Sequence, residues 1–271
     1  MAKLNFFSLF PQPYPKILHS RSDLFGKMQV LEDQEERYLV FDSFAKQSSL
    51  SKKNLKGLAL EYQKTMVLPI LFDTPKKDIL SIGLGAGCMP RLLHQLFAKA
   101  KFDIIEKREA LVEIAQNFFY FPQHKNLQVI IGSGLHFLQT TPKNYDWILV
   151  DAFDSHGIPE EINQPLFFSL AKKKLRAGGI LAVNYWSEDY RRNGAVIDGL
   201  IHEFADQFLF SDVRGCNNQI YFFLASNPAT VKILPKEQIK KWDLEFDLNL
   251  ERNLMRLTKI NTNIPFARRS K

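Results

Sequence analysis

From Asp78 onward the chain alternates short apolar runs with longer amphipathic segments, and this alternation restricts its fold more than any other feature. The pattern is typical of repeated strand–helix units, which build a mainly parallel sheet covered by helices on both faces. Parallel strands are predicted over residues 79–82, 102–105, 127–131, 147–150 and 180–183. Helices are predicted to begin near Met89, Glu109, Leu135, Pro165 and Ala195. Ala177-Gly178-Gly179 is predicted to stop the helix that precedes the last of these strands.

Two further apolar runs, residues 209–213 and 219–224, follow without a helical segment between them. Consecutive strands joined by a short loop pair antiparallel, so these runs are expected at one edge of the sheet. Such an ending is found in methyltransferase-like Rossmann folds. The predicted fold class is therefore α/β, a Rossmann-like fold of the S-adenosylmethionine-dependent methyltransferase type. Its sheet would be mostly parallel and seven-stranded, with helices on both faces.

A smaller unit precedes this region. Residues 25–31 and 37–41 alternate apolar and polar side chains around an acidic stretch, which predicts a β-hairpin. Apolar residues between positions 54 and 72 predict a helix that Pro69 must end or kink. The expected organisation is an N-terminal β-hairpin and helix subdomain over residues 1–74, a Rossmann-like catalytic domain over 75–226, and a C-terminal helical extension over 227–271.

Composition excludes several classes of protein. The chain has 36 Lys+Arg and 29 Asp+Glu, a net charge of +7, but the basic residues are scattered, which favours a solvated surface over binding to nucleic acid or a membrane. Two cysteines in unrelated contexts exclude a disulfide framework and favour a reducing compartment, the cytoplasm. The histidines show no ligand spacing, so no metal is expected. Residues 4–10 are apolar but short and lack a small-residue cleavage site, so no signal peptide is expected.

A glycine-rich turn follows the first predicted parallel strand. Gly83, Gly85 and Gly87 stand where the backbone must turn tightly and let a ligand approach a helix N-terminus. Nineteen positions after Gly87, Glu106 ends the second strand, where a carboxylate can accept hydrogen bonds from both ribose hydroxyls. Together they predict an adenosine site. Cys88 stands where the NAD fingerprint needs Gly or Ala, which favours an S-adenosylmethionine-type ligand over a dinucleotide.

An acidic loop, Asp151-Ala152-Phe153-Asp154, follows the fourth parallel strand, at the sheet edge where open α/β folds carry out their chemistry. Two carboxylates at this spacing suit the attack of an amine on a sulfonium carbon. Asp151 would receive or orient the amine proton, and Asp154 would bind a second ammonium group. The alternative is that Asp151 caps a turn and Asp154 is solvated. Tyr62 and His156 are weaker candidates, because Tyr62 is as easily a core residue and a lone His is usually incidental.

Over residues 20–226 the sequence resembles the spermidine synthase (polyamine aminopropyltransferase) family, and more closely its spermidine synthase-like branch. The motifs that carry the resemblance are Gln47, Tyr62 with Met66, residues 82–91, Glu106, Gly132-Ser133-Gly134, residues 151–159, Phe167-Phe168 and residues 178–181. The resemblance implies that decarboxylated S-adenosylmethionine is held by Gly83, Gly85, Gly87, Glu106, Ser133 and Gly134. It implies that Asp151 is the proton acceptor and that Asp154, Tyr62 and Gln47 contact an amine substrate such as putrescine. It further implies a dimer or tetramer assembled through the N-terminal hairpin, and we expect a homodimer.

Three positions depart from the pattern of that family. Ala86 stands where the family has an Asp that meets the aminopropyl ammonium, so the charge partner of that cation is missing. Ser133 replaces an Asp that receives the adenine amino group, a bond that a hydroxyl can still accept, though less strongly. Gln63 follows Tyr62 where many synthases have His, and no paired Asp-Glu precedes that tyrosine, because the segment reads Ser51-Lys52-Lys53-Asn54. The polyamine groove is therefore expected to be less acidic.

Three functions remain open on the sequence: aminopropyl transfer to a polyamine, methyl transfer from S-adenosylmethionine to a small acceptor, and a non-catalytic ligand-binding or scaffold role. The acidic loop and the long resemblance favour the first. Ala86 favours the second, because a donor that keeps its carboxylate has less need of an Asp there. Nucleic acid is a weak substrate candidate, since the loop is not the Asn-Pro-Pro-Tyr motif of adenine-N6 methyltransferases.

Overall fold

The computed structural model describes residues 14–42, 45–153, 157–186, 190–204, 208–225 and 231–257, so the apolar stretch at 4–10 lies outside the described residues. A seven-stranded sheet forms the centre, with strand order β10-β11-β9-β8-β5-β6-β7. Its strands are β5 (Asp78–Ile82), β6 (Lys101–Glu106), β7 (Leu127–Ile131), β8 (Tyr145–Val150), β9 (Leu175–Trp186), β10 (Phe208–Asp212) and β11 (Asn218–Leu224). The first five pair parallel, and β11 and β10 add an antiparallel edge next to β9. This sheet confirms the predicted fold class.

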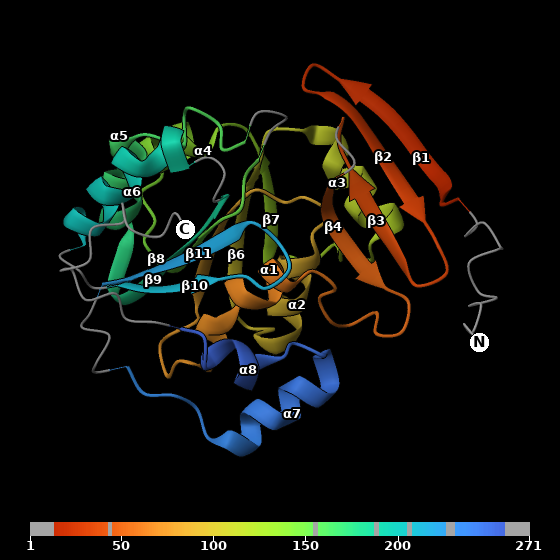
Figure 1. Ribbon diagram of the computed structural model, residues 1–271. Helices are drawn as coiled ribbons and strands as arrows, with labels where there is room; N and C mark the ends of the chain where they lie inside the picture. The colour runs from red at the N-terminus through yellow and green to blue at the C-terminus, as the bar shows by residue number, and fades with distance from the viewer. Residues whose placement is uncertain are drawn as a thin grey trace, which may run out of the picture.

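Two groups of helices cover this sheet, because successive strand residues point to opposite faces. Leu80 and Ile148 pack with α4 (Gly134–Thr140), α5 (Pro165–Lys173) and α6 (Tyr190–Glu203). Ile79 and Trp147 belong to the opposite core, with α1 (Glu61–Met66), a 3₁₀ turn η2 (Leu68–Leu71), α2 (Cys88–Leu96) and α3 (Glu109–Phe118). Figure 1 shows α4, α5 and α6 grouped on one side of the sheet.

The N-terminal unit is larger than the predicted hairpin. It is a four-stranded antiparallel sheet of β1 (Lys16–Asp23), β2 (Gly26–Glu32), β3 (Glu36–Val40) and β4 (Lys46–Ser51). The predicted hairpin is β2–β3, whereas β1 and β4 are rich in polar residues and carry little apolar alternation. Arg21 pairs with Glu113 and Arg37 donates to the Phe118 carbonyl, so this sheet lies beside α3 (Figure 1).

Three local predictions need correction. Ala177-Gly178-Gly179 does not stop a helix: α5 ends at Lys173, and the glycines lie inside β9. In the pairing of β9 with β8, Leu175 lies opposite Tyr145, and Ile180 lies opposite Trp147. Residues 176–179 of β9 therefore form a bulge, in which Gly178 has a φ of 76°. The helix predicted between 54 and 72 is confined to α1 and η2, and the helix expected near Ala195 begins at Tyr190.

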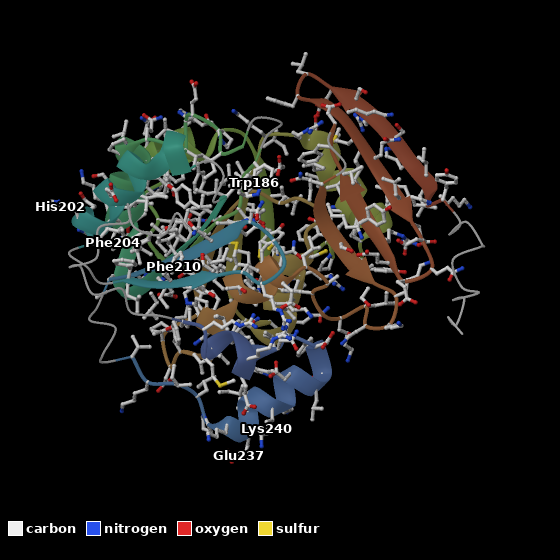
Figure 2. The ribbon with its side chains drawn as sticks, in the orientation of Figure 1. Trp186, His202, Phe204, Phe210, Glu237 and Lys240 are labelled. Carbon is white, nitrogen blue, oxygen red and sulfur yellow. The ribbon has the colours of Figure 1, made fainter. Side chains whose placement is uncertain are left out.

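The C-terminal region forms α7 (Lys236–Phe246) and α8 (Leu250–Leu254). Helix α7 buries Ile239 and exposes Glu237 and Lys240, which Figure 2 labels. On the other side of the molecule, Figure 2 shows Phe204 and Phe210 in the core beneath α6. In the described part of the chain, no helix is long and apolar enough to cross a membrane. The division into domains at residues 74 and 226 stays a prediction.

Candidate active site

The glycine turn between β5 and α2 adopts backbone conformations that favour glycine. Gly83, Gly85 and Gly87 have φ values of 98°, 54° and 72°. A Cβ atom on Gly83 would overlap the carbonyl oxygen of Asp151, because Asp151 follows β8 and its N–H donates to the Ile82 carbonyl at 2.9 Å. The turn and the acidic loop are therefore in direct backbone contact, so the predicted donor site and the predicted reacting centre are adjacent.

Glu106 lies at the end of β6, beside this turn. Its carboxylate accepts the backbone N–H groups of Leu84 and Arg108, each at 2.9 Å. Burial raises the pKa of Glu106, although these N–H groups oppose the rise. The backbone N–H of Lys107 also bonds to this carboxylate, which keeps part of its acceptor capacity. Glu106 is thus fixed in place and can still accept a hydrogen bond from a ligand hydroxyl.

Asp151 sits at the centre of a polar chain that enters from three elements. Asn184 of β9 donates its Nδ2 to the Asp151 carboxylate at 2.9 Å, and Asn218 of β11 donates to the Asn184 side-chain oxygen at 2.9 Å. The hydroxyl of Tyr62 lies within hydrogen-bonding reach of Asp151 on the other side. Burial raises the pKa of Asp151 to about 6, while the bonds from Asn184 and Tyr62 lower it. A carboxylate with this pKa is a stronger base than one in water.

Tyr62 links Asp151 to the N-terminal sheet. Its hydroxyl donates to the backbone carbonyl of Gln47 in β4 at 2.8 Å and also lies near Asp151. Burial, together with the negative charge of Asp151, raises the pKa of Tyr62 well above its ordinary value, so the hydroxyl stays protonated. Its single proton is donated to Gln47, so the lone pairs of the hydroxyl oxygen remain to accept a hydrogen bond from a ligand.

One pocket contains most of the predicted site residues. Those that line it are Gln47, Tyr62, Gly83, Gly85, Glu106, Gly134 and Asp151. Gly87 instead precedes α2 at its N-terminus, and Ser133 caps α4 while its hydroxyl donates to Glu161 at 2.8 Å. Asp154 and His156 lie outside the described residues. Among the described residues, no group of three His, Cys, Asp or Glu could hold a metal ion.

Apolar side chains also line the pocket, and two of them, Phe25 and Phe41, come from the N-terminal unit. Ile105, Leu111 and Ile162 are among the others. Arg108 donates to both carboxylate oxygens of Asp23, at 3.0 and 2.9 Å, and to the Gly26 carbonyl at 2.8 Å. A bidentate bond of this kind attaches the β1–β2 turn, which carries Phe25, to the end of β6.

Several of these residues escaped the sequence reasoning. Asn184 has a detectable signal, since it is an amide within the apolar stretch that ends at Trp186 (Figure 2). Asn218 and Glu161 have none, because each acquires its role only through a contact with a residue distant in the sequence.

Residues 59–193 match the family model described as a spermine/spermidine synthase domain. The chain belongs to this family. The resemblance to spermidine synthases is thereby confirmed. This family member is 29% identical over 205 residues to a polyamine aminopropyltransferase of Vibrio vulnificus, covering 69% of this chain and 66% of that protein. It is 26% identical over 254 residues to a polyamine aminopropyltransferase of Neisseria meningitidis serogroup B, covering 93% and 96%.

The family also shares its fold with methyltransferases. A spermidine synthase solved with the transition state analogue AdoDATO aligns with a TM-score of 0.71 and 14% identity, over 92% of this chain and 86% of that one. Human methyltransferase-like protein 13 solved with SAH aligns with a TM-score of 0.59 and 21% identity, over 77% and 99%. The eEF1A lysine and N-terminal methyltransferase of Mus musculus is 27% identical over 183 residues, 61% of this chain and 26% of that protein. At 14% and 21% identity, the likeness to these two solved structures shows that this chain shares their fold.

Ala86, in the glycine turn of this spermidine synthase family member, is fully buried. Its N–H donates to the hydroxyl of Ser48 in β4 at 3.1 Å. The glycine turn thus presents no carboxylate at this position, and its backbone is attached to the N-terminal sheet by the same contact.

Proposed function

We propose that this chain is a transferase that moves an aminopropyl group from decarboxylated S-adenosylmethionine to an amine of a polyamine such as putrescine. The observation that supports this most is the environment of Asp151: a carboxylate with a pKa of about 6 that shares one pocket with Glu106 and the glycine turn. The curated relatives named polyamine aminopropyltransferase support the same reaction.

The proposed reaction is a displacement at a carbon bonded to the sulfonium sulfur. The neutral acceptor nitrogen attacks this carbon, a C–N bond forms, the C–S bond breaks, and its electron pair neutralises the sulfur. The nitrogen then loses a proton to the Asp151 carboxylate. Asn184 holds this carboxylate, and Tyr62, whose hydroxyl lies near Asp151, would contact the acceptor amine. The product that leaves is 5′-methylthioadenosine, a neutral thioether.

The remaining site residues take binding roles in this proposal. Glu106 accepts the ribose hydroxyls, and the turn at Gly83, Gly85 and Gly87 lets the donor approach the N-terminus of α2. Ser133 and Gly134 border the base. Gln47 lines the acceptor side of the pocket, and Asp154 would bind the second ammonium of a diamine. No role for a metal is included.

A second candidate function is methyl transfer from S-adenosylmethionine to a small acceptor. The buried Ala86 favours it, because no carboxylate at that position can pair with the ammonium of an aminopropyl group. A donor that keeps its own carboxylate has no such requirement. The relative named as a lysine and N-terminal methyltransferase supports this alternative.

One titration series separates these functions. Isothermal calorimetry with S-adenosylmethionine and with its decarboxylated form should show a preference for the decarboxylated donor, and mass spectrometry should then detect aminopropyl products from putrescine or spermidine. A preference for the carboxylated donor without aminopropyl product would contradict the first function and support methyl transfer. If neither donor bound at millimolar concentration, both enzymatic functions would be wrong and the non-catalytic role would stand.

We also propose a cytoplasmic location and a homodimer. Cys88 and Cys216 are both free, which fits a reducing compartment. The N-terminal sheet, with Ile17 of β1 more than half exposed, is the surface proposed for self-association. Sedimentation equilibrium of the wild type and of Ile17→Lys tests the homodimer, since a charge at this position should lower the fraction of dimer.

A further inference from the structure

We propose that Glu161 is the residue that recognises the 6-amino group of the donor's adenine, and that it excludes 6-oxo purines from the pocket. This inference rests on the proposed function only in that an adenosine compound occupies the pocket. Glu161 lies in the loop between β8 and α5 and lines the pocket. The recognition is built from a cluster of three side chains, Lys107, Ser133 and Glu161.

The position of the base follows from the position of the ribose. Glu106 ends β6 and would hold the ribose hydroxyls. The backbone carbonyl of Glu106 accepts the N–H of Gly132 at 2.9 Å, so the end of β7 lies directly beside it. A base attached to this ribose therefore extends over residues 132–134. Ile105, Leu111 and Ile162 line the same pocket, and their apolar side chains suit the faces of a purine.

Glu161 provides a hydrogen-bond acceptor at the edge of this apolar space. The Ser133 hydroxyl donates to one of its carboxylate oxygens at 2.8 Å, and the Lys107 ammonium lies 3.2 Å from the other. The Glu161 side chain is 25% exposed. These two contacts orient the carboxylate and leave lone pairs on both oxygens. Arg108, another charged residue that lines the pocket, is already bonded to Asp23.

Ser133 itself is poorly placed to be the main acceptor for an amino group. Its one proton is donated to Glu161, and its oxygen already accepts the N–H of His136 at 3.2 Å. A carboxylate is the stronger acceptor of the two, because charge-assisted hydrogen bonds are about twice as strong as neutral ones. The negative charge that the sequence lacks at position 133 is therefore supplied by position 161.

The chemistry predicts a sharp preference between purines. Adenine presents an N–H donor at position 6, which the Glu161 carboxylate accepts. Hypoxanthine presents a carbonyl oxygen there, so two acceptors would face each other and the carboxylate would lose its partner. Sites built to hydrogen-bond one group reject the analogue that lacks it, and an unmade bond to a charged group corresponds to about tenfold to a hundredfold in affinity.

The test compares 5′-methylthioadenosine with 5′-methylthioinosine by isothermal calorimetry. These probes carry neither an aminopropyl nor an amino acid group, so the result does not depend on which donor the enzyme uses. Wild type should bind the adenosine compound about tenfold to a hundredfold more tightly. In Glu161→Gln, Ser133 can donate to the amide oxygen while the amide NH₂ faces the base, so the preference should fall to within about threefold. Glu160→Gln removes the same charge from an exposed neighbour and should keep the wild-type preference.

The outcomes separate this inference from the proposed function. If wild type binds 5′-methylthioadenosine but the preference is unchanged in Glu161→Gln, only the role of Glu161 is refuted. If wild type binds neither nucleoside, the proposed function and this inference both fail. Melting temperatures of the two variants without ligand establish that each is folded. The exchange of Glu for Gln keeps the side chain's size on a surface loop, so both should melt close to the wild type.

Discussion

Replacing Asp151 by asparagine should make the protein more stable at about pH 8 while removing most of its turnover. The reason is that the folded state holds this carboxylate in a buried position that disfavours its charge. Asparagine keeps the shape of the side chain and its amide oxygen can still accept the hydrogen bond from Asn184. The variant therefore removes a buried negative charge without opening a cavity.

The size of the gain follows from the pKa. Burial raises the pKa of Asp151 from 3.8 to about 6. A tenfold change in proton affinity corresponds to about 1.4 kcal/mol, so the ionised carboxylate costs the folded state about 3 kcal/mol at most. Because Asp151 keeps some contact with solvent, we expect a gain of about 1 to 3 kcal/mol.

The direction in which this stability difference changes with pH also follows from the pKa. Between about pH 4 and pH 6 the folded protein binds more protons at Asp151 than the unfolded chain does, so this group's contribution to stability falls as the pH rises through that window. Above pH 6 the full penalty is present, and below pH 4 it disappears. The advantage of Asp151→Asn over wild type should therefore be largest above pH 6 and small near pH 4.

Urea denaturation of wild type and Asp151→Asn at about pH 8 and about pH 4.5 measures this difference in the free energy of unfolding. The two proteins should have equal m-values. Asp198→Asn, at an exposed position of α6, is the matched control and should change stability little at either pH. Affinity for 5′-methylthioadenosine should stay near wild type, and turnover should fall by about two to four orders of magnitude, as for loss of a general base. Equal stability of Asp151→Asn and wild type at about pH 8 would refute the burial argument, and unchanged turnover would remove Asp151 from the mechanism.

Three further substitutions test the surroundings of Asp151. Asn184→Ala removes a hydrogen bond that lowers the pKa of Asp151, so the acid limb of the kcat/KM profile should move above its wild-type position; an unmoved limb would contradict this. Tyr62→Phe should reduce kcat by about tenfold or more while calorimetry shows nearly unchanged binding of 5′-methylthioadenosine; a loss of binding instead would assign the tyrosine to the donor site. Gly83→Ala should cost more than about 3 kcal/mol in urea denaturation, because its Cβ would overlap the Asp151 carbonyl. Gly215→Ala, with a similar φ of 79° but open space around it, should cost only about 1 kcal/mol, and equal losses would show that φ alone matters.

The fold could be predicted in its central part because β5, β6, β8 and most of β9 are buried, while β7 at the sheet edge still has an apolar sequence. Such strands read as continuous apolar runs, and the helices between them have the period of an amphipathic helix. The N-terminal sheet was predicted only in part. Strand β4 buries Ser48 and Ser49 beside a single large apolar residue, Leu50, so its sequence has little strand signal. The bulge at Gly178 was likewise misread, because a glycine with positive φ ends a helix and bends a strand equally well.

The sequence by itself determined the glycine turn, the acid at the end of β6 and the acidic loop after β8. These are local features: positive φ favours glycine, and the carboxyl ends of parallel strands meet at one edge of the sheet. The tertiary structure alone decided how basic Asp151 becomes and which side chain faces the base. Both depend on contacts between distant segments, Asn184 and Tyr62 with Asp151, and Ser133 with Glu161. Burial and hydrogen-bond partners are properties of packing, which residue type and spacing do not specify.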